Sequence, residues 1–254
     1  MLHFHTWLAN NSYSAPSNAT DNPFSFGHKT SSSMFEYIAA RPALHAQFNH
    51  LMGGYRLGRP SWFSSEIYPV RELLLDGYDA SSVLLVDVGG NMGHDLLKFK
   101  QAFPDVQGHL VLQDTPAVIG AAPREALQSA GIEAMGHDFF TEQPVKGART
   151  YYLHHILHDW PDERCVEIVG QIREAMKPGY SHLLINEHVI PAVGVSWEVT
   201  YLDMYMMVVF GATERTEEEW RALLEDKCGL RVMKVWNPES GVEGIIECEV
   251  PAAM

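Results

Sequence analysis

Histidines and carboxylates in the second half of the chain are the residues best suited to acid–base chemistry. His158 lies in the stretch YYLHHILHDWPDERC, at the end of an apolar run and just before a predicted helix. Imidazole can take up a proton near pH 7, so His158 is a candidate general base. Such a base needs a carboxylate that holds its orientation. The candidates are Glu187, which ends the run in LLINEHVIP, and Glu214, in FGATERT, for which a solvated loop position is the alternative.

The same stretch contains three histidines, which raises the alternative of a metal site. On a strand, His154 and His158 would share one face, and His155 would lie on the other. No matching cysteine or carboxylate cluster nearby is spaced as a third ligand, so we expect no metal here. A further alternative, that His158 is a hydrogen-bonded core residue, stays open.

A glycine-rich turn is the second candidate for chemistry. The stretch DVGGNMGH runs from Asp87 through Gly89, Gly90 and Gly93, between an apolar run and a helical pattern. Glycines allow the backbone to approach a ligand closely, and ligands of parallel sheets bind at the carboxyl ends of the strands. The turn therefore predicts a cofactor site, with a tight turn that binds nothing as the alternative.

Two more acidic positions follow later apolar runs. Asp114 ends GHLVLQD, about one strand–helix–strand step after Asp87, where a carboxylate can accept hydrogen bonds from both hydroxyls of a ribose. Asp138 and Phe139 pair an acid with an aromatic ring, which suits the amine and the face of an adenine. A plain loop aspartate and a turn before core aromatics are the respective alternatives.

The elements that must position these residues alternate between strands and helices. Apolar runs rich in β-branched residues predict buried parallel strands, and the segments between them have helical patterns. The strands are expected near 82–90, 108–114, 132–140, 149–157 and 181–189, and the helices at 94–103, 116–130 and 161–176. At the C-terminal end, Thr216 and Glu219 predict a capping box for a helix that ends near Lys227. The runs LRVMKVW and VEGIIECEV then predict an antiparallel hairpin, so we expect an α/β, doubly wound, mostly parallel sheet.

The N-terminal third has a different character. Residues 1–33 include a stretch rich in Asn, Ser, Thr, Pro and Gly and are expected to form a linker-like arm. Residues 34–80 carry apolar residues at helical spacing, with Pro42 in the first turn of a second helix and a further helix at 68–75. Residues 81–254 make up the sheet domain. Phe35, Phe48 and Trp62 are expected to be exposed and could mediate a dimer.

Composition excludes several classes of function. The formal net charge is −14, from 32 acidic residues against 18 Lys and Arg, which argues against a surface for nucleic acid or an anionic membrane. No apolar run is long enough to span a bilayer. Cys165, Cys228 and Cys248 are widely spaced and form neither a disulfide framework nor a metal motif, so we expect free thiols and a cytoplasmic protein.

Together these stretches resemble the S-adenosylmethionine (SAM)-dependent O-methyltransferases of the plant caffeic-acid and flavonoid type, in their fungal secondary-metabolism branch. The resemblance covers roughly residues 24 to 249. It rests on LVDVGGNMGHDL, LVLQDTPAVI, HDFF, YYLHHILHDWPDERC, LLINEHVIP and ERTEEEW, and on FEYIAARPALHAQFNHLMGGYRLGRPSW, which looks like the substrate-side helices.

The resemblance implies a role for each candidate residue. His158 matches the catalytic base, and Glu187 and Glu214 match the acids that flank it. Residues expected to bind the cofactor are Asp87, Gly89, Gly90, Gly93, Asp114, Asp138, Phe139 and His154. His154 stands where the family usually has Lys or Arg near the adenine. Met206 falls near the methionine that clamps the acceptor ring, and Phe48 and Met52 lie in the substrate-side helices.

The implied reaction is methyl transfer from SAM to a phenolic or enolic hydroxyl of a small natural product, with S-adenosylhomocysteine (SAH) as the product. One alternative is a pericyclase or dehydratase that uses the same pocket without transferring a methyl group. Another is a non-catalytic partner subunit. Family members carry an N-terminal winged-helix domain that dimerises and caps the substrate site, and it has no counterpart in these residues. We therefore expect a homodimer or a hetero-partner that supplies a cap.

Overall fold

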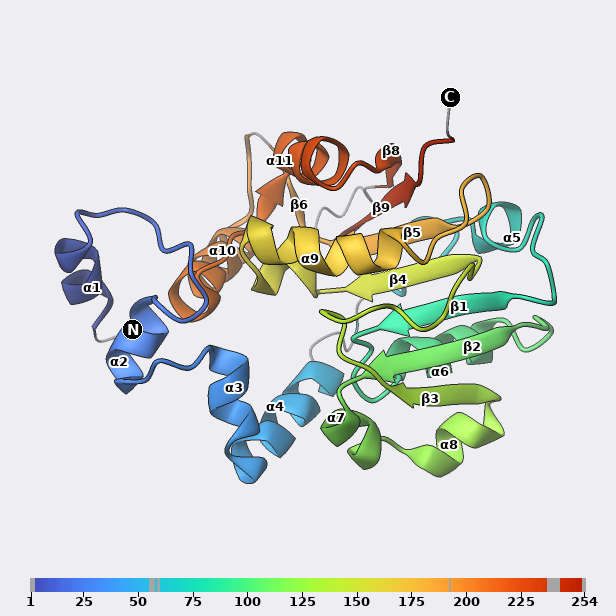
Figure 1. Cartoon of the computed structure of the whole chain (residues 1–254), viewed down its shortest axis with the longest axis horizontal. Coiled ribbons are helices and arrows are strands. Elements are labelled where there is room, and N and C mark those ends of the chain that lie inside the picture. The colour runs from blue at the N-terminus through green and yellow to red at the C-terminus, as the bar shows by residue number, and fades with distance from the viewer. Residues whose placement is uncertain (1–2, 55–57, 59, 192, 237–242, 253–254) are drawn as a thin grey trace.

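A mixed β-sheet forms the centre of the molecule (Figure 1). The computed structural model describes residues 3–54, 58, 60–191, 193–236 and 243–252. Among these residues a seven-stranded sheet has the order β3-β2-β1-β4-β5-β9-β8. The strands are β1 (Val83–Val88), β2 (His109–Asp114), β3 (Ile132–Gly136), β4 (Thr150–His154), β5 (His182–Glu187), β8 (Arg231–Trp236) and β9 (Gly244–Glu249). The first five are parallel, whereas β9 runs antiparallel to both β5 and β8, so the predicted sheet and hairpin are confirmed.

Helices cover both faces of the sheet, which explains why its central strands are apolar along their whole length. One face packs against α9 (Asp162–Arg173), α11 (Glu217–Arg221) and a π-helical turn, η2 (Ala222–Lys227). The opposite face packs against α6 (His94–Ala102), α8 (Arg124–Ser129) and the segment around α5 (Val70–Leu73). Strand order reverses between β1 and β4, and that switch point places the ends of both strands beside the predicted site.

Helix boundaries differ from the expected ones where proline intervenes. The helix predicted at 116–130 is split into α7 (Pro116–Ala121) and α8, with the N-cap of α8 at Pro123. Proline has no amide hydrogen to continue the helical hydrogen bonds, which explains the break. Pro161 is the N-cap of α9 rather than its first helical residue. The capping box between Thr216 and Glu219 is present as predicted.

The predicted arm contains two helices, which the sequence analysis missed. These are α1 (Phe4–Asn10) and α2 (Pro23–His28), and α2 packs against α10 (Trp197–Phe210). Asn22 caps α2 through a capping box with Ser25, and Pro23 fills its first turn, so a Ser- and Asn-rich stretch becomes a helix start. The proposed boundaries at residues 33 and 80 stay a prediction.

The next helices, α3 (Met34–Ala39) and α4 (Pro42–Gly54), agree with the expected pair, and Pro42 begins the second. Figure 1 shows α1–α4 and α10 on the side of the sheet where the arrows of β1, β2 and β4 end. Trp62 is not exposed as expected but lies in the core, stacked on Tyr152 with ring centroids 4.8 Å apart. Phe35 and Phe48 are half-buried. The exposed apolar surface inferred for these three residues was therefore wrong.

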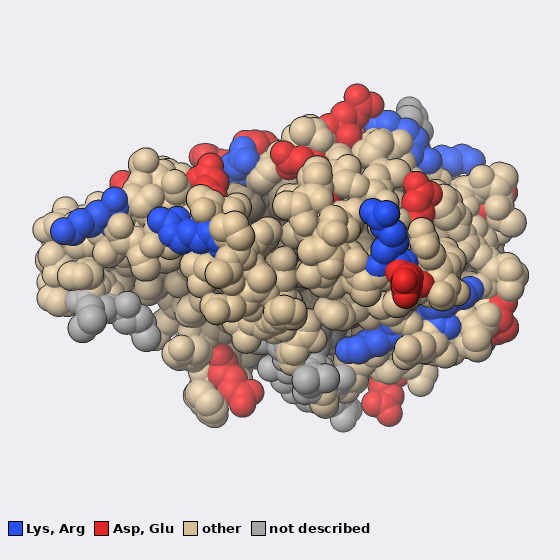
Figure 2. Space-filling model, turned by 90° about the horizontal axis from the view of Figure 1, so that it is seen from below, with Lys and Arg blue, Asp and Glu red and all other residues tan. Residues whose placement is uncertain are grey.

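The described part of the chain has no helix that is long and apolar enough to cross a membrane. On the face seen in Figure 2, Lys and Arg side chains are dispersed among Asp and Glu side chains rather than gathered into one stripe.

Candidate active site

His158 lies on a short 3₁₀ turn, η1 (Leu157–Asp159), and its side chain is buried. The expectation that it ends a strand was wrong, because β4 ends at His154 and His155 has a left-handed backbone with φ 51°. A non-glycine residue in this conformation turns the chain sharply and is enriched at functional sites. Because the strand ends at His154, alternating strand faces do not separate the three histidines.

Glu214 is the carboxylate that contacts the imidazole directly. Its Oε1 lies 2.8 Å from Nδ1 of His158, and both side chains are buried. Glu214 sits just before β7 (Arg215–Thr216), which pairs with β6 (Val189–Ile190). Its backbone amide donates to Asp203 Oδ1 at 2.9 Å, which fixes the segment against α10. From the sequence, Glu214 was a weaker candidate than Glu187. In the structure, Glu214 lies nearer to the imidazole of His158 than Glu187 does.

Glu187 holds the turn rather than the ring. Its Oε1 accepts hydrogen bonds from the backbone amides of Ile156 at 2.9 Å, Leu157 at 2.8 Å and His158 at 3.4 Å. Its Oε2 is 3.8 Å from Nδ1 of His158. A buried carboxylate at the end of β5 thus satisfies the amides that the 3₁₀ turn leaves free, and it fixes the backbone beneath the imidazole.

Arg215, which sequence reasoning missed, holds the same turn from the opposite side. Its guanidinium donates to the carbonyls of Leu157 at 3.1 Å and Trp160 at 3.0 Å, and to Asp162 Oδ1 at 2.8 Å. The side chain is 2% exposed. Five fixed donors allow one arginine to join several acceptors, so Arg215 ties β7 to the turn and to the start of α9.

Burial and neighbouring charges act against each other at His158. Burial alone disfavours the imidazolium ion, but Glu187, Asp159 and Glu214 outweigh it and raise the pKa of His158 to about 10. Burial raises the pKa of Asp159 to about 7, although His158 opposes this. Burial also opposes ionisation of Glu187, yet His158 and the neighbouring histidine rings lower the pKa of Glu187 to about 2. His158 is therefore protonated at neutral pH and loses this proton only at higher pH.

The predicted glycine turn connects β1 to α6 and packs closely against neighbouring side chains. Gly89 and Gly93 have φ values of 77° and 78°, and Asn91 adopts 52°. A Cβ on Gly90 would lie 2.4 Å from the carboxylate carbon of Asp87, and one on Gly89 would lie 2.6 Å from Ile156. These two glycines therefore let neighbouring side chains pack directly against the backbone of the turn, where a larger residue would clash.

Asp87 and Asp114 flank this turn. Oδ2 of Asp114 accepts a hydrogen bond from the Asn91 amide at 2.8 Å, and Oδ1 accepts one from Thr115 at 2.7 Å. Asp87 is buried, its Oδ2 has no hydrogen-bond partner among the described residues, and burial together with Asp95 and Asp114 raises its pKa. A buried polar atom without a partner is uncommon and fits a site that a polar ligand completes. The residues present fit a cofactor with hydroxyl groups.

The remaining predicted cofactor residues lie around the same edge. Phe139 is near the glycine turn, since a Cβ on Gly89 would lie 3.7 Å from its ring. Asp138 is exposed and its Oδ1 accepts from the Phe140 amide at 3.0 Å. His154 Nδ1 contacts Asp95 Oδ2 on α6 at 2.6 Å. The adenine contacts expected of Asp138, Phe139 and His154 stay predictions.

The expected acceptor residues separate into two groups. Phe48 and Met206 belong to one apolar cluster between α3, α4 and α10, whereas Met52 is 36% exposed and lies outside that cluster. Phe35 was not expected to belong to the site. Its ring stacks on Trp160, with centroids 5.6 Å apart, and so links the cluster to the chain beyond the base turn.

These features describe the class of protein: a doubly wound sheet with a glycine turn, a ribose-type acid and a buried histidine–carboxylate pair at one edge. The chain matches the profile of the O-methyltransferase domain family over residues 15–230. It therefore belongs to the O-methyltransferase domain family.

Individual relatives agree with this assignment. O-methyltransferase mfmE of Annulohypoxylon moriforme is 39% identical over 244 residues, covering 96% of this chain and 59% of the relative. A crystal structure of OxaC in complex with SAH and oxaline is 30% identical with a TM-score of 0.87, covering 98% of this chain and 62% of that one. A structure described as a pericyclic reaction enzyme is also 30% identical, with a TM-score of 0.84, covering 98% and 63%. The chain spans about three fifths of the length of these proteins.

Proposed function

We propose that this protein is a SAM-dependent O-methyltransferase that acts on a phenolic or enolic hydroxyl of a small natural product, with His158 as general base. The observation that carries the proposal is the 2.8 Å contact between His158 Nδ1 and Glu214 Oε1, buried beside the glycine turn. Membership of the O-methyltransferase domain family and the SAH complex of the similar OxaC support it.

The glycine turn and the acids beside it are suited to hold the cofactor. When bound, SAM supplies an electrophilic methyl group on a cationic sulfonium. Gly89 and Gly90 would lie along the amino-acid part of the cofactor, and Asp114 would accept hydrogen bonds from the ribose hydroxyls. Asp138 and Phe139 would contact the adenine.

The base turn accounts for the proton that the acceptor loses. A phenol with a pKa of about 10 is mostly protonated at pH 7 and is then a weak nucleophile. In the neutral tautomer, Nδ1–H of His158 donates to Glu214, which leaves a lone pair on Nε2. Nε2 then takes the hydroxyl proton as the oxygen attacks, and the buried carboxylates stabilise the imidazolium that forms.

The apolar cluster of Phe35, Phe48 and Met206 is suited to an aromatic or polyketide-like acceptor. Its rings adjoin Trp160, two residues after His158, so an acceptor held there would have its hydroxyl near the base. Positioning both reactants is worth several kcal/mol in enzymes that join two substrates. Met52, exposed on α4, would contribute only after movement of that helix.

The test is methyl transfer by the purified chain. With labelled SAM and a panel of phenolic and enolic acceptors, we expect turnover that falls about 10²- to 10⁴-fold in His158→Gln. Calorimetry should show unchanged SAM affinity in that variant, since His158 contacts no predicted cofactor group. His109→Gln, at an exposed ion pair with Glu133, is the matched control. Turnover that survives His158→Gln, or bound SAM without turnover on any acceptor, would contradict the proposal.

A pericyclic reaction is the second candidate, because one similar solved structure is described as a pericyclic reaction enzyme. In that case the site would rearrange its substrate without consuming SAM. Product formation that continues in the absence of methyl-donor turnover, and that is unaffected by His158→Ala, would select this candidate over methyl transfer.

We further infer that the chain associates with a second copy or with a partner chain in the cytoplasm. α10 exposes Trp197 at 75% and Tyr201 at 56%, and α4 exposes Leu51 at 62%, which are large apolar fractions for a free surface. Cys165, Cys228 and Cys248 are buried and free, in keeping with a reducing compartment. Light scattering on a size-exclusion column and microscopy of a fluorescent fusion test these two inferences; a monomer or a secreted fusion would contradict them.

A further inference from the structure

We propose that His155, His158 and His188 form a site for a divalent transition-metal ion such as Zn²⁺, and that the bound ion switches off the base. The three residues come from the end of β4, from η1 and from the junction between β5 and β6. The inhibition rests on the function proposed above, whereas the binding of the ion does not.

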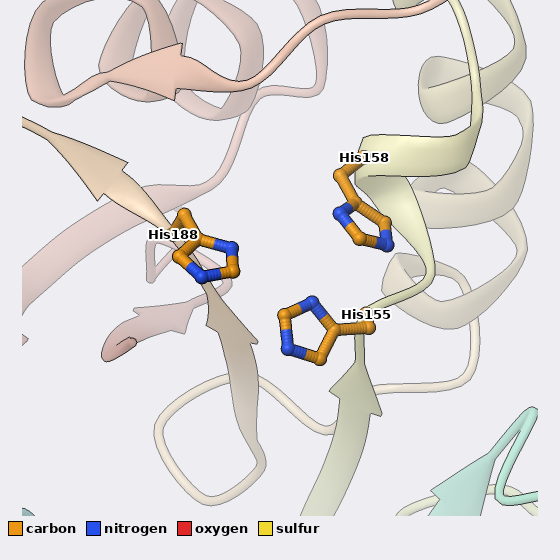
Figure 3. Close-up of side chains that lie close together, drawn as sticks. All are labelled: His155, His158 and His188. Atoms are coloured by element: carbon orange, nitrogen blue, oxygen red, sulfur yellow. The ribbon is translucent and has the colours of Figure 1, made fainter. Parts of the chain in front are cut away.

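The three imidazoles face a common space. Figure 3 shows the three rings pointing toward one another from separate segments. Each offers one ring nitrogen within 4.8 Å of the others. The ring centroid of His155 lies 4.7 Å from that of His158 and 5.1 Å from that of His188. The left-handed backbone of His155, with φ 51°, is what turns its ring toward the other two.

Two carboxylates lie against the same nitrogens. Oε2 of Glu187 is 3.5 Å from Nδ1 of His155 and 3.8 Å from Nδ1 of His158. Oε2 of Glu214 is 3.6 Å from Nδ1 of His188. Oε2 of Glu214 and Nδ1 of His188 are buried and have no hydrogen-bond partner among the described residues. Buried polar atoms without partners are rare, and an ion is one of the few things that completes them.

The donor set selects the kind of ion. Three imidazoles with nearby carboxylates suit Zn²⁺ and its neighbours in the first transition row, while Mg²⁺ and Ca²⁺ prefer oxygen ligands alone. Zn–N bonds of about 2.1 Å require donors about 3.4 Å apart in a tetrahedron. Nitrogens up to 4.8 Å apart reach that spacing by side-chain rotation. The negative charge of Glu187 and Glu214 balances the dication.

Metal binding removes the lone pair that the reaction needs. The imidazolium form of His158 releases one proton to solvent, and Nδ1 then bonds the ion in place of its contact with Glu214. The proton that remains is on Nε2, so this nitrogen cannot take the proton of an acceptor hydroxyl. The ion thus holds His158 in the wrong tautomer without occupying the cofactor turn.

Binding is measured first, without reference to activity. Tag-free protein, stripped with EDTA, is titrated with Co²⁺ while the visible absorption is followed, and then with Zn²⁺ against a chromophoric chelator. We expect one ion per chain with the intense absorption of a four-coordinate site. His155→Gln and His188→Gln should each weaken binding by at least the roughly 10- to 100-fold that loss of an outer-shell partner brings. His109→Gln, which removes an exposed histidine, should bind like the wild type.

A further variant locates the ion. His154, His155 and Glu243 form a second group with donors at compatible spacing, which shares only His155 with the first. His154→Gln should leave binding intact. If His154→Gln abolishes binding and His188→Gln does not, or if all variants bind alike, or if the wild type binds no ion, the proposed site is wrong. Circular dichroism of each variant shows whether it folds, and His188→Gln decides the matter if His155→Gln does not.

Activity gives the second readout. In the methyl-transfer assay, Zn²⁺ should inhibit the wild type at the concentrations at which it binds, and excess EDTA should restore turnover. SAM affinity should not change. Binding without inhibition would retain the site and refute its effect on the base, while inhibition that persists equally in His188→Gln would refute both. A protein that binds the ion but methylates nothing would contradict the proposed function and leave the metal site standing.

Discussion

Two carboxylates flank His158, and they act on different parts of it. Glu214 contacts the ring nitrogen, and Glu187 accepts from three backbone amides of the turn. Replacing Glu214 therefore changes the charge beside the imidazole while the turn keeps its support. Replacing Glu187 would remove the support itself. Glu214 is for this reason the residue with which to examine how charge tunes the base.

The pH profile should shift when that charge is removed. The carboxylates raise the pKa of His158 to about 10, and only the deprotonated imidazole accepts a proton, so the rate should rise with pH above neutrality. Glu214→Gln keeps an oxygen acceptor for Nδ1–H but loses one negative charge, so the pKa falls. The acidic limb of kcat/KM, measured in EDTA-treated protein, should move to lower pH by about 1 unit or more. The other titratable groups that face His158 are Asp159, Glu187, His155 and His188.

The control for this experiment is Glu217→Gln, which removes a carboxylate of similar sequence position from an exposed pair with Arg221. Its profile should coincide with that of the wild type. If the acidic limb of the kcat/KM profile does not move in Glu214→Gln, His158 does not set the pH dependence.

The close packing around Gly90 gives a second test at the scale of single residues. In Gly90→Ala the added Cβ would meet the Asp87 carboxylate carbon at 2.4 Å and Leu112 Cδ1 at 2.6 Å. The turn must shift, and overpacking of this kind lowers the free energy of unfolding by about 1–3 kcal/mol. SAM affinity in calorimetry should fall by at least about tenfold, which corresponds to about 1.4 kcal/mol. Gly120→Ala on α7, where a Cβ has open space, should leave SAM affinity unchanged and should raise the free energy of unfolding by up to about 1 kcal/mol, because alanine favours a helix more than glycine does.

At the scale of elements, strand ends and turns limit what could be predicted. Apolar runs with glycine or acidic ends located β1, β2, β4 and β5 to within a few residues, because buried parallel strands have a strong pattern. The end of β4 was misplaced, because the pattern YYLHHIL stays apolar past His154 while the backbone turns at His155. A left-handed histidine has no signature in the sequence, so the approach of His155 to His188 could not be found.

Arg215 tests how an element holds the base. Arg215→Met would keep much of the side-chain volume but leave the buried carbonyls of Leu157 and Trp160 without their donor. We expect the free energy of unfolding to fall by about 2–5 kcal/mol. kcat should fall more than SAM affinity, because the turn moves and the glycine loop does not. Denaturant unfolding and calorimetry measure the two effects.

The matched variant is Arg71→Met, which removes an exposed pair with Asp105 at 3.0 Å. An exposed ion pair contributes about 0–1 kcal/mol, so this variant should be nearly neutral. If the two arginine variants unfold alike, the buried hydrogen bonds of Arg215 do not support the turn.

At the scale of the whole molecule, the family resemblance predicted more of the site than local patterns did. The glycine turn, Asp114 and the histidine–carboxylate set lie far apart in the sequence, and the sheet order brings them to one edge as expected. Arg215 and Trp160 were not predicted as site residues. Their roles depend on side-chain contacts between residues that are 50 or more positions apart in the sequence. The helices within residues 1–33 were missed for a similar reason, since α2 rests on α10.

Phe35 joins the N-terminal helices to the sheet domain, alongside the packing of α2 on α10. Its ring stacks on Trp160, with centroids 5.6 Å apart, and contacts Phe48 at 6.0 Å and Phe210 at 5.2 Å. Aromatic pairs contribute about 0.5–1.5 kcal/mol each, so Phe35→Ala should lower the free energy of unfolding by roughly 2 kcal/mol. The acceptor would lose one wall of its cluster, and its KM should rise several-fold while the KM for SAM stays constant.

A rise in the KM for the acceptor without a rise in the KM for SAM would show that Phe35 helps to bind the acceptor. A contact that only stabilises the fold would not separate the two KM values. A variant that only loosened the protein would weaken both substrates together at temperatures near its unfolding transition. Phe26→Ala provides the comparison, because that ring is 41% exposed on α2 and its one aromatic contact among the described residues is with His3, edge-on at 6.2 Å. It should leave both KM values and the unfolding free energy unchanged. If Phe35→Ala behaves like Phe26→Ala, the helices α3 and α4 do not form the acceptor side of this site.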